Sequence, residues 1–256
     1  MAQTVHLFIP CFVNAFFPTV GIACVEILEN LGYRVVYSTD QTCCGQPAYN
    51  SGYVKEARSL ATRAIQLFGV ADYIVAPSGS CTAMLKHYYG TLPLTRKERQ
   101  DWDLCRNRFY EITQFITRVA GVNHWKGTFP HSVTFHDACH ALRELGIRDE
   151  PRQLLTRIQR LKLIEMPHAD RCCGFGGTFS VKFPELSTAI LEAKIASLKQ
   201  TGAEFVVSTD SSCLMHIAGY LKKHGESITA LHLVEVLWQA WKNDGSPPIL
   251  NGTHAP

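Results

Sequence analysis

The chain has 256 residues, of which 46% are hydrophobic and 18% charged, and its formal net charge is +3. A chain of this length builds its own hydrophobic core, so disulfides are not needed to hold it together. The small net charge argues against nucleic acid as the main ligand. The N-terminal segment lacks the cationic flank of a secretory signal, and the apolar runs end well before 18 residues, so we expect a cytoplasmic protein without a membrane span.

Strands and helices alternate through the first part of the chain. Short β-rich runs predict strands, and longer segments with helical periodicity predict helices. In chain order these are strand Val5–Ile9, helix Thr19–Leu31, strand Arg34–Tyr37, helix Tyr53–Phe68, strand Asp72–Ala76 and helix Ser80–Tyr89. This alternation predicts a parallel α/β sheet.

A charged amphipathic segment, Thr95–Val119, comes next and has no counterpart later in the chain, so we expect connecting helices there. The first order of elements then returns as strand Ser132–His136, helix Glu150–Ile158, strand Lys162–Glu165, helix Pro184–Gln200, strand Phe205–Ser208 and helix Ser211–His224. The last residues contain three prolines and little apolar content. We therefore expect a first module (1–92), a helical connector (93–128), a second module (129–242) and a disordered tail (243–256).

Eight of the ten cysteines recur in two sets with nearly the same spacing. The segment Ala71–Cys81 aligns without gaps on Ala203–Cys213, 132 residues later, and both end in Ser-Cys. The repeated cysteines are Cys11, Cys43, Cys44 and Cys81 in the first set, and Cys139, Cys172, Cys173 and Cys213 in the second. This duplication predicts an α/β fold of two parallel-sheet modules related by pseudo-twofold symmetry.

Cys11 and Cys139 directly follow the first predicted strand of their modules, and the other repeated cysteines follow the second and third strands. Because the carboxyl ends of parallel strands meet at one edge of a sheet, we expect each set of four to converge there. Clustered cysteines in a cytosolic protein bind metal or do redox chemistry, and neighbouring cysteines do not readily pair with each other. We expect Ser80 and Ser212 to cap the helices that carry Cys81 and Cys213. The eight cysteines are therefore our candidate ligands of a metal cofactor.

Other sulfur-containing residues are expected to pack in the core. Cys24 lies within an apolar helix, and Cys105 lies in the unrepeated connector. Met84 and Met215, in the third helix of each module, also fit the core better than a metal.

The histidines leave alternatives open. His136, His140 and His216 are candidate ligands or proton carriers, and a structural role suits each of them equally well. His, Asp and Cys together in 136–140 also raise the possibility of a nucleophilic thiol at Cys139. We consider that weaker, because Cys139 has a repeat partner in Cys11 and a catalytic triad needs spatial adjacency.

Six motifs carry a resemblance to a known family. They are Phe8-Ile9-Pro10-Cys11, Cys43-Cys44-Gly45-Gln46-Pro47, Pro77-Ser78-Gly79-Ser80-Cys81-Thr82-Ala83-Met84, His136-Asp137-Ala138-Cys139-His140, Cys172-Cys173-Gly174-Phe175-Gly176-Gly177 and Asp210-Ser211-Ser212-Cys213-Leu214-Met215-His216. Over nearly its whole length the chain resembles the cysteine-rich CCG domain family, which includes the cysteine-rich subunit of heterodisulfide reductase and the iron–sulfur subunits of glycolate and anaerobic glycerol-3-phosphate dehydrogenases. Its pattern is most similar to the short, stand-alone members that act in lactate utilization.

The resemblance implies an iron–sulfur cluster, [4Fe-4S] or a variant, bound by the eight repeated cysteines. In heterodisulfide reductase the last motif is Cys-x-x-Cys, whereas Met84 and His216 stand at its fourth position here. A fifth thiolate is therefore absent from both modules, and His216 is a further candidate ligand in the second. The resemblance also implies electron transfer within a complex of three proteins that oxidises L-lactate to pyruvate.

The missing motifs predict partners. The chain has no Cys-x2-Cys-x2-Cys-x3-Cys run of a ferredoxin and no Gly-x-Gly-x-x-Gly fingerprint of a dinucleotide site. We therefore expect the other subunits of a lactate-oxidation complex, including a ferredoxin-type iron–sulfur protein, as partners.

Two alternatives remain. Four thiolates per module also suit Zn²⁺, which would make the chain a structural or assembly subunit of the same kind of complex. A metal-free thiol–disulfide redox protein is the third interpretation.

Overall fold

The computed structural model describes residues 3–69, 71–244 and 249–250. The first part of the chain alternates strands and helices as the sequence predicts. Its elements are β1 (Thr4–Leu7), α1 (Cys11–Phe16), α2 (Pro18–Asn30), β2 (Arg34–Tyr37), α3 (Gln46–Asn50), α4 (Val54–Phe68), β3 (Tyr73–Ala76), α5 (Gly79–Lys86) and η1 (Tyr88–Thr91). The short helices α1 and α3 were not predicted; they begin beside the cysteines, at Cys11 and just after Cys43-Cys44.

The later part of the chain repeats this order. Its elements are β6 (Ser132–Phe135), α8 (Cys139–Leu145), α9 (Asp149–Leu155), β7 (Lys162–Leu163), α10 (Thr178–Lys182), α11 (Pro184–Lys199), β8 (Phe205–Ser208), α12 (Ser211–Lys223), β9 (Thr229–His232) and α13 (Leu233–Asp244). As α1 begins at Cys11, so α8 begins at Cys139.

The segment between them differs from the predicted helical connector. It contains α6 (Arg96–Cys105), η2 (Arg106–Arg108), β4 (Phe109–Glu111), α7 (Ile112–Gln114), a π-helical turn η3 (Phe115–Val119) and β5 (Val122–His124). β4 pairs in parallel with β3, as β9 pairs with β8, so this part of the segment has a counterpart after all. The helical prediction is wrong at β4 because Phe109 and Tyr110 pack on opposite faces of the sheet, where strand pairing outweighs local propensity.

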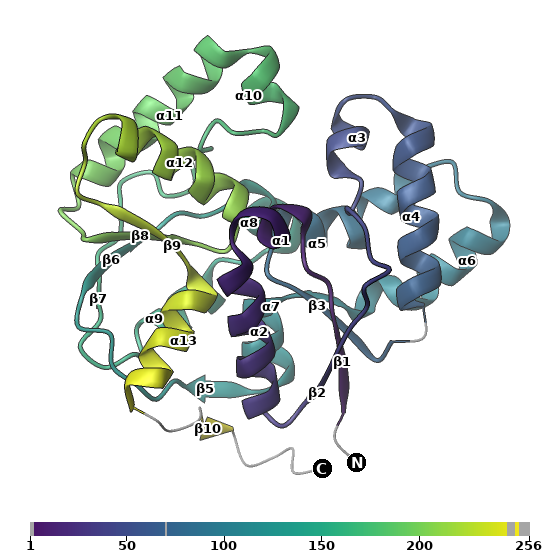
Figure 1. The fold of residues 1–256 in the computed structure, drawn as a ribbon, viewed down its shortest axis with the longest axis horizontal. Coiled ribbons are helices and arrows are strands. Elements are labelled where there is room, and N and C mark those ends of the chain that lie inside the picture. The colour runs from purple at the N-terminus through teal and green to yellow at the C-terminus, as the bar shows by residue number, and fades with distance from the viewer. Residues whose placement is uncertain (1–2, 70, 245–248, 251–256) are drawn as a thin grey trace.

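The two sheets have the same strand order, β2-β1-β3-β4 and β7-β6-β8-β9, and every neighbouring pair is parallel. Figure 1 shows the two sheets side by side, with α5 and α8 between them. α5 packs on α8, and α1 contacts α12, which is the exchange of partners that a pseudo-twofold axis produces. The predicted fold of two duplicated parallel-sheet α/β modules is confirmed.

The hydrophobic core joins the two halves. α4, α5 and α6 cover one face of the first sheet, and α11 and α12 cover one face of the second. The remaining faces share a single cluster, in which Val5 and Val75 of the first sheet and Val133 and Val207 of the second pack with α2, α9 and α13. The modules therefore have no separate cores on this side.

The predicted disordered tail, 243–256, is described only in part. Asn243 and Asp244 complete α13, and the two-residue strand β10 (Ile249–Leu250) pairs antiparallel with β5; the other residues of the tail lie outside the described ranges. Among the helices that the structure describes, none combines the length and apolar character needed to cross a membrane.

Candidate metal centre

All eight repeated cysteines line one cleft between the two halves. The empty volume of the cleft, including its open side, is about 900 Å³. Its cysteines are Cys11, Cys43, Cys44, Cys81, Cys139, Cys172, Cys173 and Cys213. The three loops of each module therefore converge as their positions after strands predict, whereas the sharing of one cleft by both sets was not predicted.

Each set has an outer and an inner pair of sulfur atoms. In the first half, Cys11 is exposed and Cys43 half-buried, with their Sγ atoms 3.8 Å apart. Cys44 and Cys81 are buried, and their Sγ atoms are 3.4 Å apart. The second half has the same gradation, with Cys139 and Cys172 half-buried and Cys173 and Cys213 buried. All ten cysteines of the chain are free.

The first cysteine of each vicinal pair accepts a backbone hydrogen bond. The Gly45 N–H donates to Cys43 Sγ at 3.4 Å, and the Gly174 N–H donates to Cys172 Sγ at 3.3 Å. The hydrogen bonds from the Cys11 thiol and the Gly45 N–H lower the pKa of the Cys43 thiol, although burial opposes them. Hydrogen bonding at the equivalent position, led by Cys139, lowers the pKa of Cys172. Both sulfurs are thus favoured as thiolates, the form that binds metal.

The helix caps differ from those predicted. α5 and α12 begin one residue earlier than Ser80 and Ser212, so the capping side chains are those of Ser78 and Asp210. Ser78 Oγ accepts from the Cys81 N–H at 3.2 Å, which fixes the turn that presents this cysteine. Asp210 Oδ1 accepts from the Ser212 N–H at 3.3 Å.

Asp210 also connects the two halves. Its Oδ2 accepts the Ser80 N–H at 3.0 Å and the Ser78 hydroxyl at 3.3 Å, both from the first half. The carboxylate is buried and lines the cleft between the two sets of cysteines. Sequence patterns gave one signal for this residue: an acid stands where the repeat has Ser78.

His136 lies against the inner cysteines of the second half. A ring nitrogen of His136 and the Sγ atoms of Cys173 and Cys213 all lie within 4.8 Å of one another, and all three residues are buried. Burial lowers the pKa of His136 to about 3, and the nearby Lys194 acts in the same direction. The imidazole is therefore neutral at pH 7, the state in which it can bind a metal.

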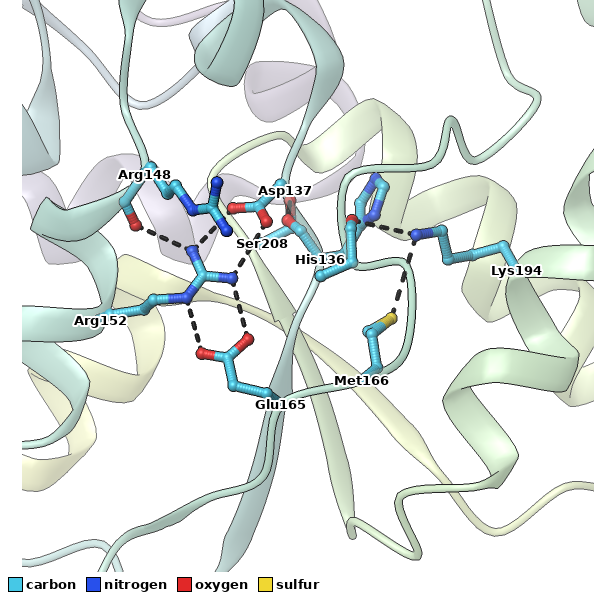
Figure 2. A network of polar contacts seen from close by, with 9 residues as sticks. His136, Asp137, Arg148, Arg152, Glu165, Met166, Lys194 and Ser208 are labelled. Atoms are coloured by element: carbon cyan, nitrogen blue, oxygen red, sulfur yellow. Dashed lines mark hydrogen bonds and ion pairs between the residues drawn. The ribbon is translucent and has the colours of Figure 1, made fainter.

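A polar network supports the loop that holds His136. The Arg152 guanidinium makes a two-pronged contact with Asp137, at 2.8 and 3.0 Å, and a second with Glu165, at 2.6 and 2.9 Å (Figure 2). On the other side, Lys194 reaches across from α11 and donates to the backbone carbonyl of Ala169 at 3.0 Å. Burial lowers the pKa of Lys194 to about 8. In the sequence, Lys194 stands out as a lysine within the apolar stripe of a predicted helix.

The other candidate histidines have partners. His140 lines the cleft, where its Nε2 lies 3.3 Å from Gln46 Nε2 of the first half and its Nδ1 lies 3.5 Å from Cys139 Sγ. His216 is half-buried, and its Nε2 lies 3.2 Å from the Ser187 hydroxyl. Among the described residues His216 does not line the cleft, so its role as a ligand remains a prediction.

The residues assigned to packing are mostly in the core. Cys24, Cys105 and Met84 have no exposed surface and belong to hydrophobic clusters, as predicted. Met215 is only half-buried.

The comparisons with known proteins agree with this arrangement. The profile of the cysteine-rich domain family matches residues 5–86 and 133–218, the two halves that carry the cysteines. The chain belongs to the cysteine-rich CCG domain family and, within it, to the lactate utilization protein A group. Lactate utilization protein A 1 of Bacillus mycoides is 43% identical to it over 94% of this chain and 99% of its own length. Lactate utilization protein A of Oceanobacillus iheyensis is 43% identical over 91% and 96%.

A solved structure shares the fold. The crystal structure of a hypothetical protein from Helicobacter pylori superposes with a TM-score of 0.65 at 10% identity. The superposition covers 95% of this chain, which spans about half (51%) of that protein. At this identity the likeness concerns the fold alone.

Proposed function

We propose that this chain is an iron–sulfur electron-transfer subunit of a multi-protein complex that oxidises L-lactate to pyruvate. The observation that carries the proposal is the pair of equivalent four-cysteine sets lining one cleft. The relatives named for lactate utilization, which match the chain over nearly its whole length, support the substrate.

The residues present fit two such clusters. Each set offers four sulfurs, and the Gly45 and Gly174 amides each direct an N–H at one of them, a contact that tunes cluster potentials. The inner pair of each set is shielded, while Cys11 faces solvent, where a partner protein can approach. A bound cluster would supply one-electron chemistry between the shielded inner sulfurs and the solvent-facing side of the site. The proposed site residues are the eight cysteines.

Oxidation of lactate itself would take place on another subunit. Removing a hydride from a 2-hydroxy acid needs a nicotinamide or flavin, and this sequence has no dinucleotide fingerprint. We propose a ferredoxin-type iron–sulfur protein among the partners, to accept or deliver the electrons. We place the complex in the cytoplasm, because clustered cysteines that bind metal suit a reducing compartment.

Zinc is the second candidate, and one observation favours it. Ligands at the 2.3 Å Zn–S distance of a tetrahedral site lie about 3.8 Å apart. The Sγ atoms of Cys11 and Cys43 have that separation, 3.8 Å, and those of Cys44 and Cys81 come close to it, at 3.4 Å. A chain that binds zinc would be a structural or assembly component of the complex.

Growth of the host organism tests the proposed function. We expect Cys43→Ala or Cys172→Ala, introduced into the host's own copy, to abolish growth on L-lactate and leave growth on glucose unchanged. Cys105→Ala, a buried cysteine outside the cleft, is the control and should grow on both. The complex purified from the control strain should also lose visible absorbance when L-lactate is added without oxygen. Normal growth of the Cys43 and Cys172 variants on L-lactate, or an absorbance that does not respond to it, would overturn the proposal.

A further inference from the structure

Phe8 and His136 occupy the same place in the two halves. Each lies three residues before the first cysteine of its set. The Phe8 N–H donates to the Val75 carbonyl at 2.8 Å, and the His136 N–H donates to the Val207 carbonyl at the same distance. The backbone is therefore equivalent, and only the side chain differs between the two sites.

The His136 ring is buried without a hydrogen-bond partner. Its exposed fraction is 0%, and neither ring nitrogen has a partner among the residues that the structure describes. The Ala169 carbonyl is close enough to act on the pKa of the ring but lies outside hydrogen-bond geometry. This carbonyl already accepts the Lys194 ammonium at 3.0 Å and the Asp137 N–H at 3.1 Å, so both of its lone pairs are used. Leaving a buried polar group unpaired costs about 1–3 kcal/mol, which a partner absent from the protein atoms would offset.

The atoms nearest to this ring form a set of metal donors. A ring nitrogen of His136 and the sulfurs of Cys173 and Cys213 lie within 4.8 Å of one another. Imidazole and thiolate together suit iron and zinc. His216 is the histidine that the sequence analysis names as a further candidate ligand. Its Nε2 lies 3.2 Å from the Ser187 hydroxyl, so this nitrogen needs no metal as a partner.

The helices that pack behind Phe8 and His136 also differ in polarity. The buried residues of α4 are Ala57, Ala61, Ala64, Ile65 and Phe68; those at the same spacing in α11 are Ser187, Leu191, Lys194, Ile195 and Leu198. Lys194 therefore stands where the first half has Ala64, just as His136 stands where it has Phe8. The first site has an apolar wall, and the second a polar and cationic one.

We propose that His136 is a ligand of the metal centre in the second half, beside Cys173 and Cys213, and that the first half binds its centre through thiolates without a histidine. The two centres are thus chemically different. This inference rests on the proposed function only in requiring that the second half binds a metal.

Nitrogen hyperfine coupling tests the inference. Protein is prepared without oxygen with ¹⁵N-labelled histidine, and Cys43 and Cys44 are replaced by Ala so that only the second centre remains. Its iron, sulfide and zinc are measured, and a paramagnetic state of the centre is examined by pulsed electron paramagnetic resonance. We expect the strong coupling of a directly bound nitrogen. It should disappear in His136→Phe, which copies the first half, and persist in His140→Gln and His216→Gln.

The possible failures are distinguishable. If the second half binds zinc, the proposal of an iron–sulfur centre in that half fails, and the same measurement on protein loaded with Co²⁺ still decides whether His136 is a ligand. Iron and sulfide with only weak nitrogen coupling, or a strong coupling that survives His136→Phe, would overturn the inference and leave the proposed function intact. Should His136→Phe not fold, loss of the coupling in His140→Gln or His216→Gln would identify another ligand and equally overturn the inference.

Discussion

The glycines that follow the vicinal cysteines are equivalent in conformation and unequal in surroundings. Gly45 and Gly174 both have φ of +88°, a left-handed conformation that costs other residues about 1–2 kcal/mol. A Cβ on Gly45 would lie 3.5 Å from its nearest neighbours, which is ordinary contact. A Cβ on Gly174 would lie 2.5 Å from the Ser187 carbonyl oxygen, so the backbone of α11 would have to move.

We therefore expect Gly174→Ala to be the more damaging of this matched pair. Gly45→Ala should lower the free energy of unfolding by about 1–2 kcal/mol, and Gly174→Ala by about 2–5 kcal/mol, because overpacking adds to the conformational cost. Urea unfolding measures the free energy of unfolding of both variants. Metal analysis should show a greater loss of metal from the second half, which carries Gly174, than from the first. Equal losses of stability would mean that the backbone of α11 moves to accommodate the added Cβ at little energetic cost.

Glu111 predicts a pH dependence of stability. This residue ends β4 and is fully buried; its Oε2 accepts the Thr113 N–H at 2.8 Å and the Thr113 hydroxyl, while Oε1 has no partner among the described residues. Burial raises the pKa of Glu111 from 4.5 to about 8, although the Thr113 hydrogen bonds oppose the shift. Between these values the folded protein holds a proton that the unfolded chain has released, so its stability falls as pH rises through this window.

Replacing Glu111 by Gln removes this titration. Between pH 5 and pH 8.5, the free energy of unfolding of Glu111→Gln relative to the parent should rise by more than about 1.4 kcal/mol, which is the equivalent of one pKa unit. Urea unfolding at the two pH values, on preparations of equal metal content, gives the difference. Parallel loss of stability in both proteins would show that Glu111 does not titrate in this range.

At the scale of elements, the contact between α5 and α8 sets how closely the two halves approach. A Cβ on Gly79, the first residue of α5, would lie 2.6 Å from Ala141 Cβ and 3.0 Å from Ala141 Cα in α8. The absent side chain therefore brings the two cysteine sets into one cleft.

We expect Gly79→Ala to force these helices apart and to cost about 1–3 kcal/mol of stability. Gly219→Ala is the control, because Gly219 lies in α12 with open space around it. It should stabilise the protein by about 0.5–1 kcal/mol through helix propensity. Thermal unfolding of the two variants checks the expectation, and a Gly79→Ala protein as stable as the parent would contradict it.

For the whole molecule, periodicity and repetition predicted much of the fold. Arg34–Tyr37 and Phe205–Ser208 are strands with the predicted bounds, because compact β-rich runs between turn signals leave few alternatives. β4 and β9 were missed; β4 has only three residues and lies within the segment predicted to be helical. α13 was missed because its residues up to 242 were placed in the second module without an assigned helix.

The candidate site was predictable as a set of residues and not as an arrangement. The duplicated cysteines follow strands, so topology alone brings each set of four together. That both sets face one cleft depends on how α5 packs on α8, and no pattern within a module encodes that contact. The roles of Asp210 and Lys194 likewise arise from contacts between segments distant in sequence.

The central claim is that the two sets of cysteines hold iron–sulfur centres. Its most direct test is the amount of iron, acid-labile sulfide and zinc per chain, with a visible spectrum, in protein purified without oxygen. We predict a brown protein with several irons and matching sulfide, of which about half remains when Cys43 and Cys44 are replaced by Ala. A colourless protein with one or two zinc ions and no sulfide would contradict the account.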